Sequence, residues 1–99
     1  MPKLFKDKGT EDIYNGNASR QARNTCPEKL WSKAQRRMDA LVRSSSLEEL
    51  GKFPGFDLKK MKGDRDGQWR IILGGRYRIS FIWLDKETKC IEITNHYGD

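Results

Sequence analysis

Cationic side chains recur through the C-terminal half of the chain, in a stretch where apolar and polar residues alternate. Arg70, Arg76 and Arg78 occupy polar positions of this stretch, and Lys62 precedes them. Guanidinium and ammonium groups at alternate positions can gather on one side of paired strands, where they would bind the phosphates of a polyanion. A solvated strand face explains the same cations, and from these residues alone it is the simpler interpretation.

Two further side chains near the C-terminus could transfer protons. His96 is the only histidine, and an ordinary pKa of about 6.5 suits an imidazole for acid or base work near neutral pH. Tyr97 follows it and could donate a proton or stack on a base. An inert terminal histidine and a tyrosine packed at the end of a strand fit the sequence equally well, so both interpretations stay open.

Other kinds of reactive site find little support. Cys26 and Cys90 are the only cysteines, and they lie far apart without a CxxC or histidine-rich spacing, so we expect both to be reduced. One histidine leaves no Ser/His/Asp or Cys/His set. The acidic residues fall mainly in expected turns and helix starts, which argues against a two-metal nuclease. We expect no cofactor and no metal.

The elements that must position the cations form an expected antiparallel meander. Period-two alternation places one set of apolar residues on a single side of two successive strands: Trp69, Ile71 and Leu73, then Tyr77, Ile79, Phe81 and Trp83. Extended chain begins near Leu58, and residues 63–67 and 74–75 are expected hairpin turns. Residues 85–89 read as a polar turn before a last strand marked by Ile91 and Ile93.

The N-terminal half reads mainly as helix. Residues 3–6 are expected to form a short edge strand and residues 10–14 one helical turn, whereas 15–25 are nearly devoid of apolar side chains and are expected to be a loop. Thr25 and Glu28 match a capping box, which predicts a helix from about Cys26 to Val42 with one apolar stripe. Ser46 and Glu49 repeat that signature before a helix over 47–50. The fold class is therefore α+β.

Size and charge restrict the class of protein. A chain of 99 residues forms one domain with a single modest core, so residues 1–99 are one unit. The net charge of +6 favours phosphates, acidic protein surfaces or anionic lipid as partners. No apolar run approaches the roughly 18 residues of a membrane span, and residues 1–10 lack the apolar core of a signal peptide. We expect a soluble cytoplasmic protein that does not bind a membrane.

The C-terminal forty or so residues resemble a known family. The run KMKGDRDGQW over residues 60–69, the strand RYRISF over 76–81 and the His/Tyr tail are similar to HigB-type plasmid-maintenance killer proteins of the RelE/ParE toxin superfamily. The resemblance implies a RelE-like fold, in which an N-terminal strand and two or three helices pack on a C-terminal antiparallel sheet. Lys59 stands where many members have histidine, and Asn95-His96-Tyr97 replaces a common Asp-Tyr-His ending.

The resemblance also implies a function. Such a protein is a toxin of a type II toxin-antitoxin system, a metal-independent endoribonuclease that cuts mRNA on the 70S ribosome and inhibits translation. Its cognate partner is a HigA-like antitoxin, a helix-turn-helix DNA-binding protein that forms a hetero-oligomer with it. The family's catalytic positions fall on Lys62, Arg78, His96 and Tyr97, and the remaining cations expected to touch RNA or ribosome are Lys59, Lys60, Arg70 and Arg76.

Metal-independent RNA cleavage requires a base near the ribose 2′-OH, cations around the phosphorane and an acid for the departing 5′ oxygen. Arg78 is the best candidate for the phosphate clamp, and Lys62 could stabilise charge or act as the base. Two other functions stay open from sequence: a ParE-like, non-enzymatic inhibitor of DNA gyrase, and a basic nucleic-acid-binding module.

Overall fold

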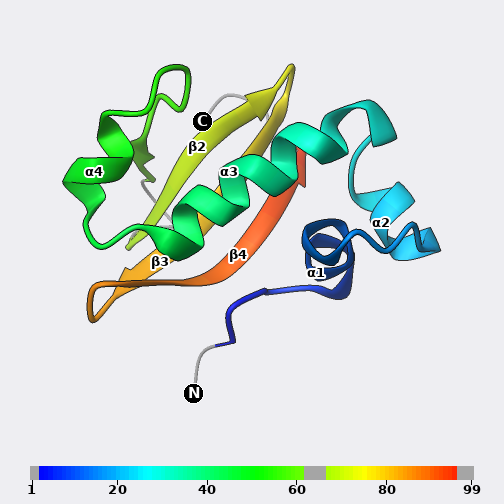
Figure 1. Cartoon of the computed structure of the whole chain (residues 1–99), viewed down its shortest axis with the longest axis horizontal. Coiled ribbons are helices and arrows are strands. Elements are labelled where there is room, and N and C mark those ends of the chain that lie inside the picture. The colour runs from blue at the N-terminus through cyan, green and yellow to red at the C-terminus, as the bar shows by residue number, and fades with distance from the viewer. Residues whose placement is uncertain (1–2, 62–66, 96–99) are drawn as a thin grey trace.

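The computed structural model describes residues 3–61 and 67–95 and confirms the α+β class (Figure 1). Its helices are α1 (Lys8–Asn15), α2 (Arg20–Thr25), the 3-10 turn η1 (Glu28–Leu30), α3 (Trp31–Arg43) and α4 (Leu47–Gly51). The strands β1 (Lys59–Lys60), β2 (Gln68–Gly74), β3 (Tyr77–Leu84) and β4 (Glu87–Asn95) form one antiparallel sheet in the order β1-β2-β3-β4. Helix α3 crosses one face of this sheet, α1 lies beside β4, and α2 packs against α1.

The core lies between α3 and the apolar face predicted from the alternation. Ile71, Leu73, Ile79 and Phe81 are fully buried there, together with residues of α3: Ala34, Met38 and Leu41. Burying an aliphatic or aromatic side chain of this size stabilises a fold by about 1.5–3 kcal/mol. The Thr88 hydroxyl donates to the Leu41 carbonyl over 2.9 Å, which ties β4 to the last turn of α3.

The turns of the meander follow their residue types. Asp85 and Lys86 both adopt positive φ, 53° and 65°, so β3 and β4 are joined by a two-residue turn. Strand β4 therefore begins at Glu87, earlier than expected. Farther along β4, the register shift opposite Phe81 is a bulge in which Cys90 has a φ of 53°. The expected turn at 63–67 falls largely outside the described residues.

The N-terminal segment, predicted to be a short edge strand, lies along β4 and forms only a single parallel bridge, between Phe5 and Ile91. The Cys90 amide donates to the Lys3 carbonyl and the Lys6 amide to the Ile91 carbonyl, over 2.7 and 2.9 Å. The Phe5 ring packs on Tyr14 with centroids 5.1 Å apart. The bulge at Cys90 gives this edge an irregular backbone that a short segment can cover.

Helices α1 and α2 correct three expectations. Helix α1 spans two turns, because Asp7 caps it by accepting from the Thr10 amide. Residues 20–25 are not a loop but α2, which Ser19 caps and which buries Ala22. Thr25 is the last residue of α2, and its hydroxyl donates to the Gln21 carbonyl instead of capping the next helix.

The main helix begins later than predicted. Chain 26–30 forms a bend and the turn η1, so α3 starts at Trp31 and has no side-chain cap. The predicted apolar stripe is correct except that Val42 is 38% exposed. Helix α4 begins at the predicted cap, where the Ser46 hydroxyl accepts from the Glu49 amide. Within residues 3–61 and 67–95, none of the helices has the length and apolar character needed to cross a bilayer.

Candidate functional site

The face of the sheet opposite α3 carries the predicted cations. Residues directly opposite each other in an antiparallel ladder share a face. Lys59 pairs with Arg70, Arg70 with Ser80, and Ser80 with Glu92, so these four form one row across all strands. Arg78 lies two residues from Ser80 on β3, in the next row between Ile72 and Thr94. We call Lys59, Arg70 and Arg78 the cationic face.

Arg70 lies beneath this face rather than on its surface. It is only 5% exposed, and its Nη1 donates to the Asp57 carbonyl over 3.2 Å and lies 3.6 Å from the Asp57 carboxylate. The same carboxylate lies 3.9 Å from the Lys59 ammonium group. Asp57 has a left-handed backbone with φ of 48°, which directs both its carbonyl and its carboxylate toward these cations. Arg70 therefore contributes a buried guanidinium to an ion pair with the half-exposed Asp57, which also lies near the exposed Lys59.

Arg78 is oriented toward the β2–β3 turn. Its Nη1 donates to the carbonyls of Gly75 and Tyr77, over 2.9 and 3.0 Å. Gly75 has a φ of 55°, which turns its carbonyl inward and which glycine adopts without steric cost. A guanidinium held at one nitrogen keeps a planar fork of donors in a fixed direction, which suits binding of a phosphate.

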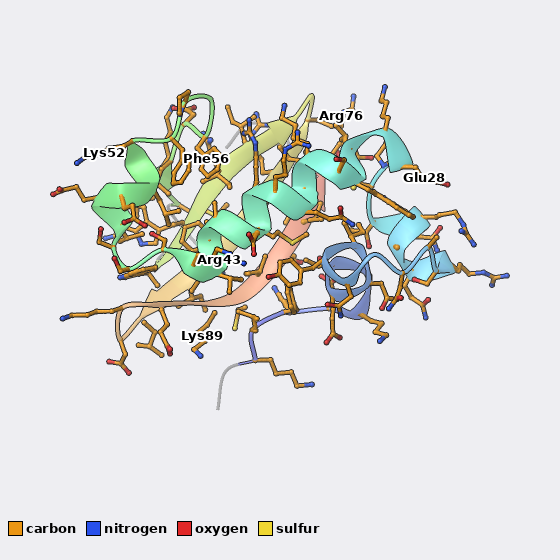
Figure 2. The ribbon with its side chains drawn as sticks, viewed as in Figure 1. Glu28, Arg43, Lys52, Phe56, Arg76 and Lys89 are labelled. Atoms are coloured by element: carbon orange, nitrogen blue, oxygen red, sulfur yellow. The ribbon has the colours of Figure 1, made fainter. Side chains whose placement is uncertain are left out.

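A groove of about 530 Å³ lies next to this turn. It separates the α2–α3 connection from the end of the sheet, and we call it the hairpin groove. Among the described residues, its lining includes two cations and no acidic side chain: Pro27, Lys29, Leu30, Gly74, Gly75, Arg76, Tyr77 and Asn95. Figure 2 shows Arg76 at the end of the hairpin, close to the connection that carries Glu28. Lys29 and Arg76 supply positive charge from opposite walls.

The structure brings some of the predicted residues together and separates others. Lys59, Arg70 and Arg78 share one face, whereas Lys60 pairs with Trp69 and so belongs to the opposite face. Arg76 lies in the turn before β3 and borders the hairpin groove. The predicted catalytic residues Lys62, His96 and Tyr97 lie outside the described residues. Asn95, which precedes His96, pairs with Tyr77 beside Arg78.

No family model and no curated protein matches this chain. Its function must therefore be argued from the residues and their geometry. Among the described residues, no three His, Cys, Asp or Glu side chains gather as a group able to hold a metal ion.

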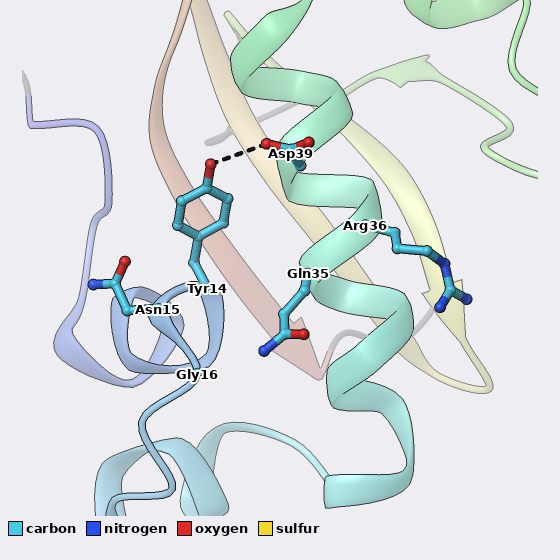
Figure 3. A pocket seen from close by; sticks show the side chains of 6 residues that line it. All are labelled: Tyr14, Asn15, Gly16, Gln35, Arg36 and Asp39. Carbon is cyan, nitrogen blue, oxygen red and sulfur yellow. Dashed lines mark hydrogen bonds between the residues drawn. The ribbon is translucent and has the colours of Figure 1, made fainter.

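A second hollow, of about 440 Å³, lies between α1 and α3 (Figure 3). The Tyr14 hydroxyl donates to the Asp39 carboxylate across it, over 3.2 Å, and Arg36 borders it from α3. Burial and the Asp39 carboxylate raise the pKa of the Tyr14 phenol. Of the described residues predicted to act on RNA, none lines this hollow, and the Tyr14–Asp39 hydrogen bond joins two helices.

Sequence reasoning missed Asp57, Lys29 and Leu30. The Asp57 carboxylate lies 3.6 Å from Arg70, but its place in an irregular stretch before β1 gave no periodic signal. Lys29 and Leu30 reach the hairpin groove from a turn more than forty residues away in sequence. The glycine at 74 was a partial signal, because a Cβ there would lie 3.0 Å from the Leu30 side chain.

Proposed function

We propose that this chain is a RelE-like toxin of a type II toxin-antitoxin system that cuts mRNA on the ribosome. The observation that carries the proposal is the ladder register that places Lys59, Arg70 and Arg78 on one face. Lys59 and the partly buried Arg78 bring positive charge to this face, with Arg70 buried beneath it, and this charge suits binding of a phosphodiester. The resemblance of residues 60–69 and 76–81 to the toxin family supports the same reaction.

In the proposed reaction Arg78 binds the scissile phosphate. A base removes the proton of the ribose 2′-OH, the 2′ oxygen attacks phosphorus, and the bond to the 5′ oxygen breaks. The departing 5′ oxygen takes a proton, which leaves a cyclic phosphate and a 5′-hydroxyl. Lys62 and Arg78 stabilise charge on the phosphorane, and His96 and Tyr97 are the candidates for proton transfer. This scheme uses no cofactor.

The charge distribution supports a ribosome-bound mode of action. Between Arg20 and Arg43 the chain has seven Lys and Arg against two acidic residues, so this segment carries most of the net +6. These cations lie on α2, η1 and α3, and Lys29 of η1 also lines the hairpin groove. We propose that the cations of α2 and η1, which are Arg20, Arg23 and Lys29, contact ribosomal RNA in the cytoplasm, while a HigA-like antitoxin neutralises the free toxin.

Mapping mRNA 5′ ends in a cell-free translation reaction tests the proposal. Wild-type protein is expected to create new 5′ ends, and Arg78→Ala and Lys62→Ala are each expected to lower the cleavage rate about 100-fold. Arg43→Ala and Lys52→Ala are matched controls, since they remove exposed charges far from the cationic face. They should cut as wild type does.

Two results would contradict the proposal. Intact message in the presence of folded wild-type protein excludes ribosome-dependent cleavage, and an unaltered cleavage rate for Arg78→Ala removes the assigned phosphate clamp. A supercoiling assay run with the same samples tests the gyrase alternative, because inhibition of gyrase without cleaved message would support a ParE-like function instead.

A further inference from the structure

Arg37 joins the helical layer to the edge of the sheet. From α3, its Nη1 donates to the Ile72 carbonyl over 2.6 Å and to the Gly55 carbonyl over 2.9 Å. Its guanidinium carbon also lies 4.8 Å from the centre of the Phe56 ring, which Figure 2 shows next to β2. One side chain therefore connects three parts of the chain: α3, the segment after α4 and β2.

Ile72 is the residue of β2 that faces Arg78. Its amide donates to the Phe56 carbonyl over 2.8 Å and its carbonyl accepts from Arg37, so both of its polar backbone groups point away from β3. Ile72 and Arg78 are thus a non-hydrogen-bonded pair of the β2–β3 ladder, the kind in which side chains come closest. A shift of Ile72 would alter the surface against which Arg78 lies.

The segment held by Arg37 also holds Arg70 and Lys59. Gly55 and Phe56 are followed directly by Asp57, whose carbonyl and carboxylate contact Arg70 and whose carboxylate lies near Lys59. Strand β1 begins at Lys59, which pairs with Arg70. The residues that precede Lys59 therefore lie beyond the regular β1–β2 ladder. Arg37 supplies the donor at Ile72 where the ladder has stopped.

We propose that Arg37 is a positioning residue, which sets the placement of Arg70, Arg78 and Lys59 on the opposite face of the sheet. This inference rests on the proposed ribonuclease function. Lysine at this position keeps the charge but lacks the planar guanidinium, whose carbon lies over the Phe56 ring while its Nη1 donates to both carbonyls. The specific geometry of arginine, more than its charge, is what the arrangement uses.

The first test compares Arg37→Lys with Thr88→Val in the cell-free cleavage reaction. Thr88→Val removes the buried hydrogen bond to Leu41 at another part of the α3 interface, and so provides a destabilised control that leaves residues 55–57 untouched. The comparison is made under conditions where urea titration shows every variant to be folded. Arg37→Lys is then expected to cut at least about tenfold more slowly than wild type. Thr88→Val is expected to cut at the wild-type rate, and equal losses in both variants would overturn the inference.

The second test does not depend on cleavage. In amide NMR spectra, Arg37→Lys is expected to shift the signals of Asp57, Lys59, Arg70 and Arg78, whereas Thr88→Val should leave them in place. Shifts confined to residues 37, 55 and 56 would overturn the positioning role even if cleavage falls. If wild-type protein fails to cut at all, the proposed function fails while these spectra still decide whether Arg37 positions the cations.

Discussion

Arg70 and Ser80 stand directly opposite each other in the middle of the sheet, and both are buried on the face away from α3. Arginine is rarely buried unless a partner compensates its charge. Asp57 provides that compensation from the segment before β1. The stability of the sheet thus depends, through this buried polar pair, on the segment before β1, which also contacts Lys59.

Arg70→Ala is expected to lower the free energy of unfolding by about 2 kcal/mol, because it removes a buried charged hydrogen bond and leaves the Asp57 carbonyl without this donor. Arg43→Ala is the matched control. Its ion pair with Asp39 is shorter, 2.8 Å, but its side chain is 78% exposed, so the expected loss is below about 0.5 kcal/mol. Urea unfolding measures both, and equal losses would contradict the role given to burial.

Gly9→Ala is expected to destabilise the protein by about 1–3 kcal/mol, because α1 and α2 cross closely at this residue. A Cβ at Gly9 would lie 2.7 Å from the Gln21 carbonyl oxygen, which belongs to the backbone and cannot swing aside. Gly51→Ala is the opposite case, since the nearest atom to its Cβ would be Leu58 Cδ2 at 4.0 Å. Gly51→Ala should raise the free energy of unfolding by about 0.5 kcal/mol, because alanine reduces the conformational freedom of the unfolded chain.

Thermal and urea unfolding of the two glycine variants give the comparison. If Gly9→Ala leaves the free energy of unfolding unchanged, α1 and α2 can separate at no energetic cost, and this result would contradict the close crossing.

Asp12 is expected to titrate below the ordinary range of an aspartate. The Ser19 hydroxyl donates to its carboxylate over 2.6 Å and, with the Lys8 ammonium group 3.2 Å away, lowers the pKa of Asp12 against the opposing effect of burial. Because this pKa is lower in the folded than in the unfolded protein, the stabilisation is fully present above about pH 4 and disappears as the pH falls through the folded value.

Ser19→Ala is therefore expected to raise the pKa of Asp12, and carbon NMR titration of the carboxyl group measures it. The same substitution removes the cap of α2, and this loss should lower the free energy of unfolding by about 1 kcal/mol at every pH. Asp12→Asn should flatten the dependence of stability on pH below about pH 4. A wild-type Asp12 that titrates at the ordinary value would contradict the assigned hydrogen bond.

The sequence by itself determined the parts of the fold that local pattern controls. Alternation of apolar residues from Trp69 to Trp83 identified the buried face, and the Ser46 cap identified the start of α4, because neither depends on distant chain. The same local logic failed at Thr25, where a capping signature occurs inside the last turn of α2. Helix α2 itself was missed because it buries only Ala22 and so shows almost no apolar pattern.

Only the tertiary structure decided which cations share a face and which are compensated. Lys59 and Lys60 are adjacent in sequence, yet ladder pairing with Arg70 and Trp69 assigns them to opposite faces. Arg70 and Arg78 read alike as polar positions of strands, but one is buried against Asp57 and the other turns toward Gly75. The physical reason is that charge compensation and strand register depend on contacts between residues far apart in the chain, which alternation along one strand does not encode.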